Sequence, residues 1–534
     1  MGGGILFGYD LGIISGALPQ LKNSFQLSCF QQELVVSCTL VGALLGSLFA
    51  GFVVDTYGRR SCIVFSVSVF FISSILLAFT PILLILYFSR TLVGFAIALS
   101  AASECVYVTE LAPSHARGSL VSLNEVGITI GFLLAYIANA VFSASHGWRL
   151  MFGSALAFCL VVFYSAYKLP KSPRYLILNN QYSNARSALS KIRCQTTDKE
   201  RTAVEREFIA MNFVKEEAVN NEEGFLLSLI KQVTSPALLI GCVLVFIQQA
   251  TGEPNMLIYA NTIFEAVGYS SQQSANLGAL GLGMVKVVST VICLFLVDNY
   301  GRKTFLIVGG CLMTFSTFAL SFLTSNFGFV NYNACDETGT TYITQNQSTY
   351  SFNTTPPTVT NHTLVSNFTQ NYTEHSALNT TQFLNSTHIN STSENSETTS
   401  ALGKSLSLVF LFVYIAAFSF SFGPLNWIIQ SEIYPTKYRG RFFAISTALN
   451  WLFNLLISST FLNFITASGG LSLPFLVYSV LTLLAVLFIC KFVPETRGKT
   501  LEEIDLLMSK KSLNCNCTSF CSGKNDSLHM PLIE

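Results

Sequence analysis

The stretch that decides the fold is Gln248-Gln-Ala-Thr-Gly-Glu-Pro-Asn-Met-Leu-Ile-Tyr259, which lies inside the apolar run 238–260. The run is long enough to cross a bilayer, yet its middle holds a Gly, a Glu, a Pro and two adjacent carboxamides. Lipid offers no partner to a freed backbone group or a charge, so this helix must face protein or water. Carboxamides both donate and accept hydrogen bonds, which suits a ligand made of hydroxyl groups. Broken helices that line a midplane cavity, in corresponding pairs from two related halves, are typical of secondary transporters.

The composition indicates an integral membrane protein. Of the 534 residues, 51% are hydrophobic and only 11% are charged, against about 25% charged in soluble domains. The sequence therefore predicts an all-α membrane protein. Windows of about 20 residues predict twelve spans, at 3–21, 32–54, 61–80, 82–107, 119–141, 148–169, 236–260, 275–297, 304–326, 404–427, 441–464 and 471–493. The first span has no basic lead and is not read as a signal peptide.

Charge sets the predicted orientation. The segment 171–235 is rich in Lys and Arg, whereas 326–403 contains neither, so the positive-inside rule places the first in the cytosol and the second outside. The second segment is a Thr/Ser/Asn-rich run that cannot pack a core, and we predict a disordered, glycosylated loop, although such a composition also makes sequons by chance. The sequons are Asn346, Asn353, Asn361, Asn367, Asn371, Asn379, Asn385 and Asn390.

Motifs recur along the chain in the same order. Asp55-Thr-Tyr-Gly-Arg59-Arg60 returns as Asp298-Asn-Tyr-Gly-Arg302-Lys303, and Glu110-x-x-Pro-x-x-x-Arg117-Gly returns as Glu432-x-x-Pro-x-x-x-Arg439-Gly. The repeat predicts two six-helix halves, 1–170 and 236–494, with the loop 327–403 inserted in the second. A cytosolic helical linker, 171–235, joins them, and a cytosolic tail, 495–534, follows.

Together these motifs, with Ser172-Pro-Arg174, Gln248-Gln249, Gly423-Pro424, Trp427 and Pro494-Glu-Thr-Arg-Gly498, resemble the sugar porters of the major facilitator superfamily. The loop between spans nine and ten, and the motif Gly252-x-Pro-Asn255, resemble those of class III facilitative glucose transporters. Types ten and twelve are the nearest, and the sequence of residues 431–435 favours type ten. The resemblance implies the major facilitator fold and facilitative transport of a glucose-like hexose, or of dehydroascorbate, by alternating access. Proton-coupled sugar symport is the nearest alternative, and a transporter-like nutrient receptor is a more distant one.

The expected substrate site combines the broken span with the tenth and eleventh spans. Trp427 has a flat, amphipathic ring that suits the apolar face of a pyranose, and the alternative is that it anchors the helix at the lipid headgroups. Asn450 and Asn454 are four residues apart and therefore lie on one helix face. The resemblance adds Glu125, where hexose facilitators have a Gln, and Lys286, where they have an Asn. Each would be costly alone at depth, so we predict that they face each other across the cavity; the alternative is a snorkelling lysine. The predicted substrate-binding residues are Gln248, Gln249, Asn255, Tyr259, Trp427, Asn450, Asn454, Glu125 and Lys286.

The first span is expected to be the broken partner of the seventh, since Gly8, Gly12, Gly16 and Pro19 interrupt an apolar helix. Asp10 needs a counter-charge at depth, and Arg90 is the candidate. In proton-coupled porters that the family resembles, such a pair is linked to proton movement. A permanently ionised pair that only holds helices together is the alternative, because a neighbouring Arg lowers the pKa of an Asp.

A cytosolic latch is predicted at the repeated motifs, with acids of one half meeting arginines of the other when that side closes; charges that only stop translocation are the alternative. Its residues are Arg59, Arg60, Glu110, Arg117, Asp298, Arg302, Glu432 and Arg439. Each exposed pair contributes only about 0 to 1 kcal/mol, which suits a contact that must open every cycle.

The remaining features exclude other classes. The chain has no phosphate loop, metal-ligand array or convergent catalytic set, so we expect no cofactor and no enzyme. A bridge between Cys29 and Cys335 is compatible with the predicted topology, and Cys515, Cys517 and Cys521 are either palmitoylated or reduced. We expect a monomer in the lipid bilayer with a sugar substrate and no nucleic acid, in the plasma membrane, the perinuclear endomembranes, or both.

Overall fold

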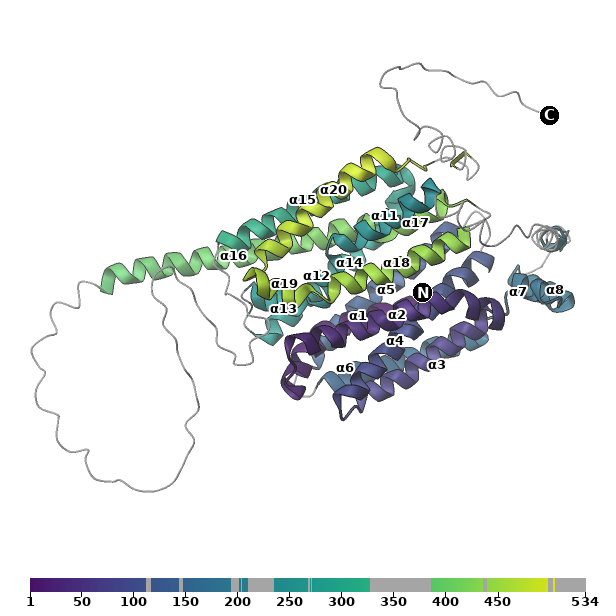
Figure 1. The fold of residues 1–534 in the computed structure, drawn as a ribbon, viewed down its shortest axis with the longest axis horizontal. Helices are drawn as coiled ribbons and strands as arrows, with labels where there is room; N and C mark the ends of the chain where they lie inside the picture. The colour runs from purple at the N-terminus through teal and green to yellow at the C-terminus, as the bar shows by residue number, and fades with distance from the viewer. Residues whose placement is uncertain are drawn as a thin grey trace, which may run out of the picture.

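The computed structural model describes residues 1–111, 117–143, 147–193, 201–202, 204–209, 235–267, 269, 271–326, 386–435, 439–497 and 503–504. These residues form helices and no strand, and the helices run roughly parallel in one bundle (Figure 1). Eleven helices are long and apolar enough to cross a bilayer. The predicted all-α membrane fold is confirmed.

Each half of the chain supplies six long elements among the described residues. The first half contains α1 (Gly2–Phe25), α2 (Cys29–Tyr57), α3 (Arg59–Ala78), α4 (Leu83–Leu111), α5 (Arg117–Val141) and α6 (Trp148–Lys168). The second contains α11 (Pro236–Ala250) with α12 (Glu253–Ile258) and α13 (Ala260–Ala266), α14 (Gln272–Tyr300), α15 (Arg302–Asn326), α16 (Ser386–Phe420) with α17 (Phe422–Ile433), α18 (Arg439–Ser458) with α19 (Phe461–Ser468), and α20 (Ser472–Phe492). The linker contributes α7 (Pro173–Leu178) and α8 (Tyr182–Ile192).

The two ends of the bundle carry different segments of the chain. The linker end bears α7 and α8, and the loop end bears the last residue of α15 and the first of α16 (Figure 1). Apolar side chains of α7 and α8, including Leu176, Ile177 and Ala185, form a small cluster with Phe208. The linker end is the one predicted to be cytosolic.

The repeated Gly-Arg motif makes the same turn in both halves. Gly58 separates α2 from α3 with φ 86°, and Gly301 separates α14 from α15 with φ 90°. This backbone conformation is accessible to glycine and strained for other residues, so the repeat preserves a turn that a side chain would destabilise. The next residue in each case, Arg59 or Arg302, begins a helix.

The predicted break of the first span is wrong. α1 is continuous from Gly2 to Phe25, with Pro19 inside it. Its glycines instead allow α5 to approach: a Cβ on Gly8 would lie 1.9 Å from the carbonyl oxygen of Ile128, and one on Gly4 would lie 2.5 Å from that of Asn124. A small residue at every fourth position brings two helix backbones together in a membrane.

The segment 327–403 ends in helix, because α16 begins at Ser386, and the candidate membrane span begins at Leu402. The helix therefore extends into the low-complexity run, beyond the apolar stretch that enters the bundle. Asn390 lies on this helix, and the other seven sequons lie outside the described residues. Their glycosylation stays a prediction.

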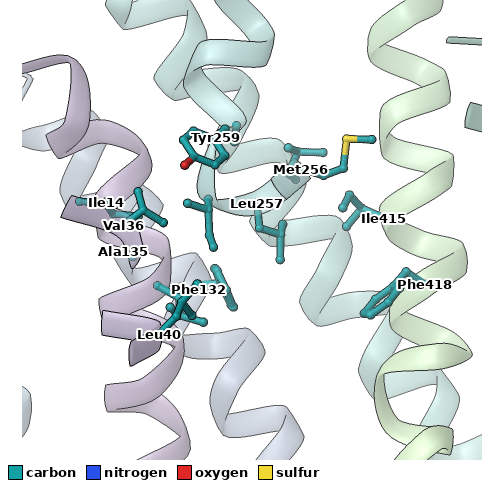
Figure 2. Close-up of a cluster of buried hydrophobic side chains, with 14 of the residues drawn as sticks. Ile14, Val36, Leu40, Phe132, Ala135, Met256, Leu257, Tyr259, Ile415 and Phe418 are labelled. Carbon is teal, nitrogen blue, oxygen red and sulfur yellow. The ribbon is translucent and has the colours of Figure 1, made fainter. Parts of the chain in front are cut away.

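An apolar cluster packs the halves together at mid-bundle. Figure 2 shows Ile14 of α1, Val36 and Leu40 of α2, and Phe132 and Ala135 of α5 near Leu257 and Tyr259 of the seventh element. All are almost fully buried. Burial of such side chains is the main favourable contribution to the contact between the halves in this state.

Candidate functional site: a polar centre between two helical halves

The seventh element breaks where the sequence predicted a break. α11 ends at Ala250, Gly252 has φ 88°, and α12 begins at Glu253 with Pro254 in its first turn. The Tyr414 hydroxyl donates to the carbonyl oxygen of Thr251 at 2.9 Å, so one freed backbone group finds a partner in protein. The break thus stays buried and satisfied, as a membrane interior requires.

The two carboxamides before the break are buried and face other helices of the second half. Gln248 Nε2 donates to the carbonyl oxygens of Phe422 and Gly423, at 3.2 and 3.5 Å, and its Oε1 accepts from Asn426 Nδ2 at 2.7 Å. Gln249 Nε2 donates to Asn450 Oδ1 at 2.5 Å. The predicted residues Gln248, Gln249 and Asn450 therefore belong to one polar centre on α11, α17 and α18.

Asn255 and Tyr259 continue the polar centre towards the loop end. Asn255 Nδ2 donates to the Tyr478 hydroxyl at 2.7 Å, and the Tyr259 hydroxyl donates to the carbonyl oxygen of Ser458 at 3.1 Å. Asn454 Oδ1 accepts from Ser458 Oγ at 3.0 Å. In this state Asn255 and Tyr259 hold the chain at α12 against α20 and α18, whereas the Asn454 contact stays within α18, and all three are almost fully buried.

Aromatic rings flank the centre. Trp427 is half-buried and packs on Phe443, with ring centroids 5.5 Å apart, and Trp451 packs on Phe7 of α1 at 5.4 Å. The second contact joins the two halves. Neither ring is a fully exposed headgroup anchor, and both lie on the helices that carry the carboxamides.

The direct partner of Lys286 is Glu253 and not the predicted Glu125. Lys286 Nζ lies 2.6 Å from Glu253 Oε1, and no ion pair joins Glu125 to a described cation within 4.0 Å. The first turn of α12 brings Glu253 to α14 because Gly252 redirects the chain, so the nearer acid comes from the same half. Lys286 is buried, which also excludes the snorkelling alternative.

The predicted pair of Asp10 and Arg90 is present. Arg90 Nη1 lies 2.8 Å from Asp10 Oδ1, and both side chains are almost fully buried. Arg90 also donates from Nε to the carbonyl oxygen of Val35 at 3.4 Å, and its guanidinium lies over the Phe152 ring. The pair joins α1 to α4 inside the first half.

The latch residues form ion pairs within each half in this state. Arg59 lies 3.0 Å from Glu110 and 3.1 Å from Asp55, and Arg302 lies 3.4 Å from Glu432. Arg60 donates to the carbonyl oxygen of Tyr167. The side chains of Arg117, Asp298 and Arg439 lie outside the described residues, so contacts between the halves at this end stay a prediction.

Two acids of structural importance were missed by sequence reasoning. Glu495 accepts from the backbone N–H groups of Arg302 and Lys303, at 3.0 and 3.1 Å, and so caps α15. The Pro494-Glu-Thr-Arg motif is visible in the sequence, but the backbone groups that Glu495 binds could not be predicted from it. Glu33 of α2 accepts from the backbone and side-chain N–H groups of Asn463, and this contact joins the two halves at the loop end.

Other predictions concern cysteines and metals. Cys29 is disulfide-bonded to a cysteine outside the described residues, so its pairing with Cys335 stays a prediction. Within the described part of the chain no group of His, Cys, Asp and Glu is arranged to hold a metal ion. In the linker, the Glu207 carboxylate raises the pKa of the Arg193 guanidinium, which keeps that pair ionised.

Three comparisons bear on the family. The family model described as "Sugar (and other) transporter" matches residues 1–336 and 385–508. Facilitated glucose transporter member 12 of Homo sapiens is 36% identical, over 98% of this chain and 86% of the relative. Member 10 of Xenopus tropicalis is 38% identical, over 99% of this chain and 95% of the relative. These two identities do not separate type ten from type twelve.

Solved structures give the same fold. The proton:xylose symporter XylE bound to 6-bromo-6-deoxy-D-glucose superposes with a TM-score of 0.68 at 26% identity, covering 95% of this chain and 97% of that one. The inward open conformation of XylE from E. coli superposes with a TM-score of 0.66 at 26% identity, with the same coverage. The major facilitator fold predicted from the repeated motifs is confirmed.

Proposed function

Because this chain belongs to the sugar (and other) transporter family, we propose that it carries a glucose-like hexose across a membrane by alternating access. The bundle is a multi-pass membrane protein, and its polar centre lies on α11, α17 and α18 of the second half, which can rock against the first. No step requires a cofactor or covalent chemistry. Dehydroascorbate, of similar size and polarity, is a second proposed substrate.

The carboxamide network is the observation that supports a polyhydroxyl substrate most directly. Gln248, Gln249, Asn426 and Asn450 lie together at mid-bundle, and some of their oxygen atoms have no partner: Gln249 Oε1 and Asn426 Oδ1 are buried without a hydrogen bond among the described residues. A buried acceptor left unpaired is costly, and a substrate hydroxyl supplies the missing donor. The Trp427 and Trp451 rings offer apolar faces for the sugar ring.

Proton-coupled symport is the second candidate. It is supported by the buried Asp10–Arg90 pair and by similarity to a structure described as a proton:xylose symporter. Uptake of labelled 2-deoxyglucose and labelled dehydroascorbate into proteoliposomes separates the two mechanisms. Uniport predicts equal initial rates with and without an inward pH gradient, whereas symport predicts accumulation that a protonophore abolishes. No uptake of either compound above empty liposomes contradicts the proposed function.

We further propose that the linker end is cytosolic and that the segment 327–403 is glycosylated outside or in a lumen. Enzymatic removal of N-glycans should lower the apparent mass of the protein, and replacing all eight sequon asparagines by glutamine should abolish that shift. An unchanged mass in the wild type contradicts the topology. Imaging of a fluorescent fusion decides between the plasma membrane and perinuclear endomembranes.

A further inference from the structure

The charges at the polar centre do not balance. Three ionisable side chains approach it: Glu125 of α5, Glu253 of α12 and Lys286 of α14. Lys286 is paired with Glu253, because its Nζ lies 2.6 Å from the Glu253 carboxylate. The same atom lies 5.2 and 5.4 Å from the ring centroids of Phe132 and Phe418. Glu125 is the member of the three that has no ion-pair partner within 4.0 Å among the described residues.

Glu125 is half-buried and unpartnered in the part of the chain that the structure describes. No hydrogen bond or ion pair reaches its carboxylate, although it points across the interface between the halves: Oε1 lies 3.6 Å from the position that a Cβ on Gly423 would occupy. Gly423 is otherwise uncrowded, because no atom comes nearer than 3.6 Å to that position. Glu125 therefore lies in contact distance of Gly423 on α17, across the interface between the halves.

The buried atoms that lack a hydrogen-bond partner on Gln249 and Asn426 are oxygen atoms, which accept. The Gln248 Nε2 group is occupied by the carbonyl oxygens of Phe422 and Gly423, and the Asn426 Nδ2 group is occupied by Gln248 Oε1. The buried oxygen atoms left without a partner are Gln249 Oε1 and Asn426 Oδ1, and the Glu125 carboxylate is a further acceptor. A hydroxyl group both donates and accepts hydrogen bonds, whereas an ammonium group only donates. The ammonium group also carries the positive charge that would pair with the Glu125 carboxylate.

We propose that Glu125, with Asn426 and the Gly423 backbone, forms a cation subsite within the sugar site, and that the transporter prefers a hexose bearing a protonated amine, an amino sugar, over a neutral hexose. The inference rests on the proposed function and deepens it. An unpaired carboxylate between helices is costly, and a substrate ammonium relieves that cost at binding while a hydroxyl relieves less.

The test measures preference in the full-length chain in proteoliposomes. Unlabelled glucose, glucosamine and N-acetylglucosamine compete with labelled 2-deoxyglucose at neutral pH. We expect glucosamine to halve uptake at about a tenfold lower concentration than glucose, the ratio that one charge-assisted hydrogen bond supplies. N-acetylglucosamine, which lacks the charge, should show no such advantage.

Two variants locate the effect. Glu125→Gln replaces the acid by an uncharged group of the same shape and should bring the glucosamine-to-glucose ratio to about one. The double variant Glu253→Gln/Lys286→Asn removes the pair and keeps Glu125, so it should retain the preference. Glu205→Gln, in the ion pair with Arg186 outside the bundle, is the control and should leave both values unchanged.

Three results overturn the inference. The first is the same glucosamine-to-glucose ratio in the wild type and in Glu125→Gln, and the second is loss of the preference only in the double variant. The third is uptake that a pH gradient drives, that shows no preference for the amine, and that Glu125→Gln abolishes. The last would assign Glu125 to a proton. Failure of the proposed function is distinguishable, because it removes uptake of every hexose by the wild type. In that case calorimetric titration of the purified protein with glucosamine and glucose still decides, since equal binding by the wild type and by Glu125→Gln overturns the subsite.

Discussion

Asp10 and Arg90 show what a single buried charge requires. Their contact of 2.8 Å is almost fully shielded from solvent, and each is the other's only ionic partner among the described residues. Removing one member of such a pair leaves an uncompensated charge, at a cost of about 3 to 5 kcal/mol. The pair therefore holds α1 to α4 whether or not it also carries a proton.

Asp10→Asn should lower the unfolding temperature of the purified protein markedly, because Arg90 keeps its charge and loses its counter-ion. Asp10→Asn/Arg90→Gln should recover much of the loss, since no charge is then left buried. Thermal unfolding in detergent, followed by tryptophan fluorescence, provides the measurement. A single variant as stable as the wild type would show that Arg90 has another source of compensation.

Lys286 marks the limit of sequence reasoning at the residue scale. The need for an acidic partner could be predicted, since an intramembrane Lys is costly alone. The identity of that partner could not, because it depends on the direction the chain takes after Gly252. The burial of Gln248, Gln249 and Asn450 among protein groups was predictable, because carboxamides inside an apolar run need polar partners away from lipid. Their contact with a substrate stays a prediction.

Among elements, α1 and the α11–α12 break show two uses of glycine. The same residue type predicted a break in both spans, but only Gly252 has a positive φ. In α1 the glycines recur every four residues and lie against α5, at Gly4, Gly8, Gly12 and Gly16. Sequence spacing alone did not distinguish a helix that breaks from one that packs closely, because both need residues without side chains.

Gly8→Ala should prevent normal packing of α1 on α5, since its Cβ would lie 1.9 Å from a backbone oxygen that cannot move away alone. We expect a strong fall in the yield of monodisperse protein on size-exclusion chromatography. Gly51→Ala in α2 is the matched control, because a Cβ there meets nothing within 4 Å, and it should behave as the wild type. Equal yields for the two variants would contradict the packing role.

Gly252→Ala separates steric clash from backbone strain. At Gly252 an added Cβ lies 2.6 Å from the Tyr478 ring and φ is 88°, whereas at Gly469 φ is 70° and nothing lies within 4 Å. Gly469→Ala should cost only the strain, about 1 kcal/mol, and should keep 2-deoxyglucose uptake. Gly252→Ala should lose most uptake, because Asn255 donates to the Tyr478 hydroxyl that the clash displaces. Similar uptake by both variants would show that the break does not depend on this packing.

At the scale of the whole molecule, the structure is closed between its halves at the loop end. Glu33 binds Asn463 there, and Asn276 Nδ2 donates to the carbonyl oxygen of Asn139 at 3.0 Å, so α2 and α5 contact α19 and α14. At the linker end the described ion pairs stay within each half. The bundle of long apolar helices was predictable from hydropathy, but which end is closed depends on side-chain contacts far apart in the chain.

Glu432→Gln tests the predicted latch. The substitution removes the ion pair with Arg302, and we expect slower 2-deoxyglucose turnover with unchanged surface expression, because a gate contact acts on the conformational step. Surface biotinylation and initial uptake rates, measured on the same cells, provide the values. Unchanged turnover per surface molecule would assign these charges to membrane insertion alone.

The central claim is that a polar site between the halves opens alternately to the two sides of the membrane. The most direct measurement is alkylation of Gly423→Cys by a membrane-impermeant thiol reagent, in a background where the exposed Cys311 and Cys490 are replaced by serine. The account predicts labelling from either side of the membrane and slower labelling when glucose is present. No labelling from either side, or a rate that glucose does not change, would contradict it.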